Sequence, residues 1–208
     1  MRHALTTQGY GVRLRPVRME DAAFIVWLRN LDYVKGRVGD SAADVAGQET
    51  WLNRYFDREG DYYFLVETLN EVRLGTHAIY NLNETRAEIG RIVIRSGVSA
   101  GVPASLLLLD LFYGQMGMTQ VRATSVASNY KAHSLLRRLG FSQVKLEPAG
   151  QVISGQAVDV LHFAQIAEDW LRARQELIPA ARLAEIGIRD WEQSCLHGRS
   201  SPRVVADG

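Results

Sequence analysis

The stretch NYKAHSLLRRLGF, residues 129–141, carries the most structural information in this chain of 208 residues. Four of its apolar residues recur at the spacing of one helix face: Ala132, Leu135, Leu136 and Leu139. An asparagine opens the stretch, where its side chain suits a helix N-cap, and a Gly-Phe pair closes it. The pattern predicts a helix that either packs only in the hydrophobic core or also forms one wall of a ligand site.

The composition is that of a globular protein, with 47% apolar residues, 23% charged residues and a net charge of +1. This charge gives no electrostatic reason to expect a nucleic acid or an anionic membrane as partner. The single cysteine, Cys195, excludes an intrachain disulfide and a cysteine-based zinc cluster. No apolar run approaches the roughly 20 residues that span a bilayer, and the N-terminus lacks a signal-peptide core. We therefore expect a cytoplasmic protein.

Hydrophobic periodicity predicts an irregular order of helices and strands along the chain. The predicted strands lie at 11–17, 61–68, 71–82, 86–95, 120–129, 141–148 and 157–166. The predicted helices begin near residues 19, 44, 103, 130 and 167. This order differs from the regular alternation of a doubly wound sheet, and it predicts a mixed α/β layer.

The C-terminal part of the chain is expected to divide after the main domain. Residues 1–176 form the predicted domain, and residues 177–195 form a separate amphipathic helix after Pro179. Residues 196–208 are expected to be a disordered tail. Either a strand edge or the extra helix could support a homodimer, and the sequence leaves this open.

The order of elements and two motifs resemble the GNAT superfamily of N-acetyltransferases, which use acetyl-coenzyme A. The resemblance covers about residues 12–171 and implies an α/β (α+β) fold. In this fold a mixed, mostly antiparallel central sheet is flanked by helices, here with a C-terminal helical extension. The strongest motif is an asparagine followed, in order, by a small residue, an apolar residue, a basic residue and the pair Gly-Phe. The matching positions are Asn129, Ala132, Leu135, Arg138, Gly140 and Phe141.

The second motif is the segment EIGRIVIRSGVSAGVPASLLL, residues 88–108. In the family, a central strand leads to a loop whose backbone amides hold the CoA pyrophosphate at a helix N-terminus. The sequence departs from the family pattern at Val98 and at Pro103, which lacks an N–H to donate. The resemblance implies cofactor contacts from Ile92, Val93, Ile94, Arg95, Gly101, Val102, Pro103, Ala104, Asn129 and Arg138.

The resemblance also implies where the chemistry takes place. Glu88 is the expected general base, acting directly or through a water steered by Tyr80. His77 is a less favoured alternative, because it alternates with apolar neighbours as core residues do. A backbone N–H of residues 92–94 would stabilise the oxyanion. The expected acceptor contacts come from the end of the first helix, at Arg29 and Asn30.

One expected catalytic group is missing. Many family members carry a tyrosine that protonates the leaving thiolate at the position of Leu136. A thiolate is a fairly stable anion near neutral pH, so this acid is the most dispensable part of the machinery. Ser134 or His133 could replace it.

The leading expectation is therefore an N-acetyltransferase that carries acetyl from acetyl-CoA to a primary amine. Details of the sequence resemble both amino-sugar-nucleotide and ribosomal-protein N-terminal acetyltransferases. An amino sugar or sugar nucleotide, with its phosphates held by Arg29 or Arg54, is favoured over a peptide N-terminus. A third hypothesis is a catalytically idle protein that binds acyl-CoA, since fold alone does not establish activity.

Overall fold

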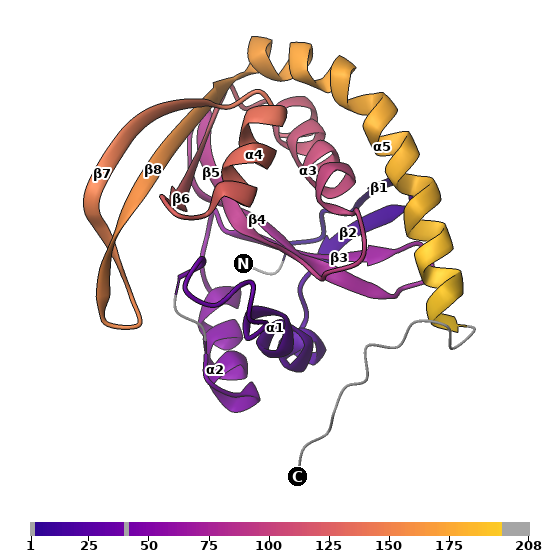
Figure 1. Ribbon diagram of the computed structural model, residues 1–208, viewed down its shortest axis with the longest axis horizontal. Coiled ribbons are helices and arrows are strands. Elements are labelled where there is room, and N and C mark those ends of the chain that lie inside the picture. Colours follow the sequence, from indigo (N-terminus) through magenta and orange to yellow (C-terminus); the bar gives the residue numbers. More distant parts are fainter. Residues whose placement is uncertain (1–2, 40–41, 197–208) are drawn as a thin grey trace.

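The computed structural model describes residues 3–39 and 42–196, and within them eight strands form one sheet in the order β1-β2-β3-β4-β5-β6-β8-β7 (Figure 1). The strands are β1 Thr7–Gly9, β2 Val12–Pro16, β3 Tyr62–Thr68, β4 Arg73–Asn83, β5 Arg86–Ile94, β6 Gln120–Val126, β7 Ser142–Ile153 and β8 Gln156–Ile166. The α-helices are α1 Ala22–Arg29, α2 Val45–Phe56, α3 Gly101–Asp110, α4 Tyr130–Arg138 and α5 Ala167–Leu196. None of the helices in the described ranges is both long and apolar enough to cross a membrane.

The sheet opens between β5 and β6, the fifth and sixth strands in its order. Every other neighbouring pair in the described sheet is antiparallel, but β5 and β6 run parallel. Their paired residues extend from Arg86–Gln120 to Ile89–Ala123 and no further. Beyond that point β5 continues to Ile94 and β6 to Val126 without pairing to each other. The C-terminal halves of the two strands therefore diverge.

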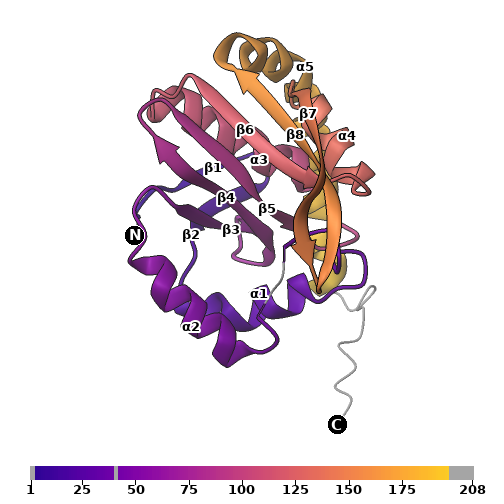
Figure 2. The same cartoon turned by 90° about the vertical axis from the view of Figure 1, so that its left-hand side faces the viewer.

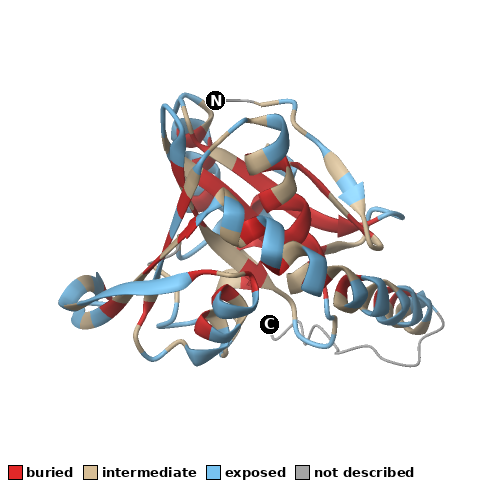
Figure 3. Cartoon of the chain, turned by 90° about the horizontal axis from the view of Figure 1, so that it is seen from above, coloured by how far each residue is buried: buried red, intermediate tan, exposed pale blue. Residues whose placement is uncertain are grey.

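Helices cover both faces of the sheet, and strand alternation explains which residues they meet. In β3, Tyr63 and Leu65 pack in the cluster of α1 and α2, whereas Phe64 and Val66 pack in the cluster of α3, α4 and α5. Figure 2 shows α1 and α2 on one side of the sheet. Buried residues concentrate in the central strands and α3 (Figure 3). The predicted fold class, a mostly antiparallel mixed sheet flanked by helices, is thus confirmed.

The β7–β8 hairpin is longer than the sequence predicts. It extends away from the rest of the sheet (Figure 1) and is largely exposed. The turn consists of Ser154 and Gly155, with φ of 50° and 76°, as two-residue hairpin turns require. Residues 149–156, which the sequence places between the two predicted strands, are mostly strand. A register shift between Glu147 and Gln151 lets the pairing continue past the extra residues.

Helix α5 is continuous from Ala167 to Leu196, with Pro179 inside it. Proline removes one internal hydrogen bond and crowds the preceding turn. Both halves of α5 nevertheless bury residues in the main core, Leu177 before the proline and Ala181 and Ile188 after it. We infer that this packing holds the helix together through Pro179. The predicted boundary between residues 176 and 177 falls inside α5, and the rest of the predicted tail, 197–208, lies outside the described residues.

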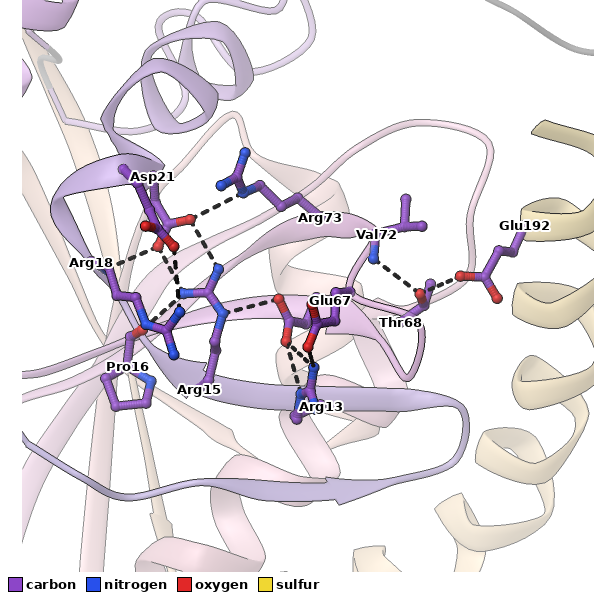
Figure 4. Close-up of polar contacts among 12 residues, drawn as sticks. Arg13, Arg15, Pro16, Arg18, Asp21, Glu67, Thr68, Val72, Arg73 and Glu192 are labelled. Carbon is purple, nitrogen blue, oxygen red and sulfur yellow. Dashed lines mark hydrogen bonds and ion pairs between the residues drawn. The ribbon is translucent and has the colours of Figure 1, made fainter. Parts of the chain in front are cut away.

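A buried network of charges joins β2 to its neighbours (Figure 4). The guanidinium of Arg15 donates to the Asp21 carboxylate at 2.8 and 3.0 Å and to Glu67 at 3.0 Å. Arg13 lies 2.7 Å from Glu67, and Arg73 lies 3.1 Å from Asp21. Each buried carboxylate therefore has two guanidinium partners, which offsets the cost of removing it from water. Because Asp21 directly precedes α1, the network fixes the start of that helix against the sheet.

The C-terminal end of α5 is also attached by a buried carboxylate. Glu192 accepts a hydrogen bond from the Thr68 hydroxyl (Figure 4). It accepts another from Asn70 Nδ2 at 2.9 Å. Thr68 ends β3, so these bonds connect the last turns of α5 to the β3–β4 hairpin. The last turns of α5 are thus bonded to the sheet, and the predicted domain division stays a prediction.

Candidate active site

A cavity of about 810 Å³ lies where β5 and β6 diverge. It is lined by residues 88–94 of β5 and 123–126 of β6. Gly101, at the N-terminus of α3, and Asn129, just before α4, line this same cavity. The two motifs that the sequence singled out therefore face one space.

The N-terminus of α3 reaches the cavity at Gly101, whereas Val102, Pro103 and Ala104, also predicted to contact the cofactor, lie outside the lining. The helix begins at Gly101, where an added Cβ would meet no atom within 4 Å. The first internal bond runs from Ala104 N–H to the Ala100 carbonyl, at 3.0 Å. The amides of Gly101 and Val102 precede this bond and suit an anionic group. Pro103 is buried at the third position, where the missing N–H costs the helix no internal hydrogen bond.

Asn129 caps α4 and also lines the cavity, and its contact with the cofactor stays a prediction. Its Oδ1 accepts from Ala132 N–H at 3.3 Å, and its Nδ2 lies 3.4 Å from the Arg37 carbonyl. Leu136, in place of the usual tyrosine, lines the cavity with only 4% of its surface exposed. His133 is buried, with Nε2 3.0 Å from the Val126 carbonyl, and it is absent from the cavity lining.

Glu88 and Tyr80 lie together on the face of the sheet that α1 and α2 cover. They are direct partners across β4 and β5, and both line the cavity. Burial, together with the charge of Glu88, raises the pKa of the Tyr80 hydroxyl to about 12, so it stays protonated and can donate. The tyrosine ring crosses over Gly90, where an added Cβ would lie 2.5 Å from the hydroxyl oxygen. A glycine at this point of β5 therefore allows the close approach.

Arg91 is a cavity residue that the sequence did not predict. It occupies a bulge, where Arg91 and Ile92 oppose one residue of β4, and its φ is 51°. Its guanidinium binds the buried Asp61 carboxylate through two bonds, at 2.6 and 2.8 Å. Three aromatic rings surround its Cζ at 4.8 to 5.3 Å from their centroids: those of Trp51, Tyr63 and Tyr80. No pattern in the sequence locates a bulge of this kind, so the position of Arg91 in the cavity could not be predicted.

The β7–β8 hairpin contributes two more cavity residues that the sequence did not predict. His162 Nε2 lies 2.7 Å from Glu147 Oε2, and its Nδ1 lies 3.4 Å from the Thr124 hydroxyl. Hydrogen bonds from His162 and Lys145 lower the pKa of the Glu147 carboxyl. Cross-strand pairing places these groups together, so only the hairpin register reveals them.

The cavity has an excess of positive charge. Among the described residues, five cationic side chains line it against two anionic ones, Glu88 and Glu147. The cationic residues are Arg29, Arg37, Arg58, Arg91 and Lys131. Because walls of low dielectric strengthen such a field, the cavity favours anionic ligands.

Several predicted site residues lie outside the cavity lining. The guanidinium of Arg95 is stacked between Trp27 and Trp191, with centroids at 5.4 and 4.8 Å. Arg138 is exposed in the last turn of α4. The Asn30 amide donates to the Val26 carbonyl at 2.9 Å and so completes the end of α1. Of the acceptor pair, only Arg29 lines the cavity.

His77 is a buried core residue rather than a cavity residue. Ala78 N–H donates to its Nδ1 at 3.0 Å, and its Nε2 lies 3.3 Å from the Ser105 hydroxyl. Burial lowers the pKa of the His77 imidazole to about 3. The imidazole is therefore neutral and too weakly basic to serve as a general base at neutral pH.

A family model described as the acetyltransferase (GNAT) domain matches residues 12–142. The chain belongs to the GNAT acetyltransferase family. The match includes Glu88, the α3 N-terminus and Asn129, whereas the cavity residues of the β7–β8 hairpin lie beyond it. The family is one of acyltransferases that use acetyl-CoA. No curated protein matches this chain.

Solved GNAT structures share the fold at low sequence identity. FdhC, a nucleotide-linked sugar GNAT, has a TM-score of 0.69 and 21% identity over 86% of this chain and 98% of its own. Mycobacterium smegmatis RimJ, in complex with CoA-disulfide, has a TM-score of 0.70 and 23% sequence identity. The match covers 82% of this chain and 90% of RimJ. A variant of the spermidine N-acetyltransferase SpeG from Vibrio cholerae has a TM-score of 0.68 and 18% sequence identity. The match covers 78% of this chain and 98% of SpeG. At such identities the likeness shows the fold alone.

Proposed function

We propose that this GNAT protein transfers the acetyl group of acetyl-CoA to a primary amine of an amino sugar or a sugar nucleotide. The observation that carries the proposal is the single cavity shared by Gly101, Asn129 and Glu88 at the divergence of β5 and β6. A cavity of about 810 Å³ has the size of a small-molecule site. Transfer would take place directly, with both substrates bound.

Each part of the cavity has a role in this reaction. The amides of Gly101 and Val102 would bind the pyrophosphate of acetyl-CoA at the positive end of α3. The main chain of residues 92–94 would hold the pantetheine arm and donate to the thioester oxygen. Glu88 would take a proton from the acceptor amine, directly or through a water bound by Tyr80. The amine nitrogen then bonds to the acetyl carbon, the carbon–sulfur bond breaks and CoA leaves as a thiolate.

The excess of positive charge supports an anionic acceptor. Arg29 and Arg58 line the cavity on the side of α1 and α2, whereas Arg54, which the sequence also suggested for phosphates, is exposed outside it. A sugar nucleotide carries two phosphate groups for such side chains, whereas a peptide N-terminus needs none. The free Cys195 also suits the reducing cytoplasm, which is where we place the enzyme.

Two measurements test the proposal in sequence. Calorimetric titration with acetyl-CoA should show one site per chain. Thiol release should then appear with UDP- or dTDP-linked amino sugars and be weaker with short peptides that have free N-termini. Turnover of peptides alone would favour a protein N-terminal acetyltransferase. Binding of acetyl-CoA without turnover on the whole panel would favour the idle protein, and absence of binding would refute the proposal.

A further inference from the structure

The guanidinium of Arg91 fills a site that has the composition of a cation-binding box. Aromatic faces and a carboxylate are the groups that bind organic cations in proteins. Here Trp51, Tyr63 and Tyr80 supply the faces, and Asp61 supplies the carboxylate. The occupant is covalently part of the protein.

Arg91 separates this box from the acceptor side of the cavity. The side chains of Arg91, Trp51, Tyr63 and Tyr80 line the cavity, whereas Asp61, only 5% exposed, does not. The side chain of Arg91 keeps 19% of its surface exposed. An acceptor that reaches Glu88 would therefore meet the guanidinium and not the carboxylate behind it.

We propose that Arg91 is a specificity-determining residue that excludes polyamines and other acceptors bearing a second cationic group. The inference rests on the proposed acetyl transfer and names the class of amine that this site rejects. The accepted amine is one whose neighbouring groups are uncharged or anionic. Spermidine, the substrate named for the structurally similar SpeG, belongs to the rejected class.

The physical reason is charge repulsion without a free counter-charge. Two unpaired unit charges about 5 Å apart at an effective dielectric near 20 would weaken binding on the order of a hundredfold, and the Asp61 partner of Arg91 reduces this effect. Both Asp61 oxygens already accept from Arg91, and Arg58 lies 3.9 Å from one of them, so two cationic side chains of the protein already share this carboxylate. The aromatic faces are likewise covered by the guanidinium.

Removal of the guanidinium should reverse the selectivity. Arg91→Gly suits the backbone, because a φ of 51° is a conformation that glycine adopts readily. The variant leaves Asp61, Glu88 and three aromatic rings beside the vacated volume. Arg58 remains at its edge, 3.9 Å from Asp61 and 5.4 Å from the Trp51 ring centroid. This arrangement should bind an organic cation.

The experiment is a calorimetric titration of spermidine into four full-length proteins. These are the wild type, Arg91→Gly, Arg91→Gln and the control Arg86→Gln. Arg86 is exposed on the same strand, so the control removes the same charge away from the cavity. We expect Arg91→Gly and Arg91→Gln to bind spermidine at least about tenfold more tightly than wild type and the control. Ethylguanidinium should raise the melting temperature of Arg91→Gly but not that of wild type, because it refills the box.

Two outcomes would overturn the inference. One is that wild type binds or acetylates spermidine, a test that needs no variant to fold. The other is that folded Arg91 variants gain no affinity for spermidine. Acetyl-CoA is titrated into the same preparations, so a failure of the proposed acetyl transfer appears separately as a loss of that binding.

Discussion

At the scale of single residues, Glu88 carries the proton transfer that we propose. Its carboxylate lines the cavity beside Tyr80, on the face opposite α3 and α4. Glu88→Gln keeps the shape of the side chain and removes its basicity. We expect kcat to fall about a hundredfold or more while the Kd for acetyl-CoA is unchanged. Steady-state kinetics and calorimetry check this, and wild-type turnover in the variant would exclude Glu88 as the base.

Asn129 allows the capping role to be separated from the ligand role. Aspartate caps helices as well as asparagine does, so Asn129→Asp should leave the free energy of unfolding within about 0.5 kcal/mol of wild type. The new negative charge should weaken acetyl-CoA binding about tenfold, because the ligand is anionic. Urea denaturation and calorimetry measure the two effects. An unchanged Kd would mean that Asn129 is a cap alone.

His77 should make stability depend on pH. Its pKa is lowered from the usual 6.5 to about 3 by burial, so the unfolded chain binds a proton that the folded chain does not. The free energy of unfolding should therefore fall as pH drops below about 6.5, by about 2 kcal/mol from this group between pH 7 and 5. His77→Gln removes the titrating group, and its urea unfolding should show a correspondingly shallower pH dependence. Equal slopes in the two proteins would contradict the burial of a neutral imidazole.

Residues held by local motifs could be predicted from the sequence, and residues placed by long-range geometry could not. Gly101 and Asn129 stand at helix starts, which local motifs predict, whereas their common cavity with Glu88 was expected only through the resemblance to the family. Arg91 enters the cavity because of a bulge, which changes the side of the strand that a residue faces. Arg95, which the resemblance assigns to the cofactor, stacks on Trp27 and Trp191 outside the cavity lining, a position that no local pattern indicates.

At the scale of elements, α5 shows that packing can override a local signal. Pro179 predicts a break, but core contacts on both sides keep one helix. Ile188 is 1% exposed and belongs to the part of α5 that the sequence assigned to a separate extension. The β7–β8 hairpin is a second example, because its strands continue through the register shift between Glu147 and Gln151.

The role of α5 in the core gives a direct test. Ile188→Ala should lower the free energy of unfolding by about 2–5 kcal/mol, because it leaves a cavity in the main core. Leu183→Ala, on the same helix but 71% exposed, should change it by less than about 0.5 kcal/mol. Urea denaturation of both variants measures the difference. Similar small effects would show that the C-terminal part of α5 is a separate extension.

At the scale of the whole molecule, the divergence of two parallel strands creates the site. It joins the α3 and α4 face, which presents backbone amides and Asn129, to the α1 and α2 face, which presents Glu88 and Arg91. A thioester that lies in the divergence would have its nucleotide on one face and its acetyl group on the other. This arrangement depends on the sheet order, which the sequence indicated only through its resemblance to the family. The homodimer that the sequence left open remains a prediction.

The most direct test is a crystal structure of the protein with acetyl-CoA. We predict that the pyrophosphate contacts the amides of Gly101 and Val102 and that the thioester carbon lies between β5 and β6, facing Glu88. Acetyl-CoA bound elsewhere, or a thioester remote from the divergence of the two strands, would contradict the account.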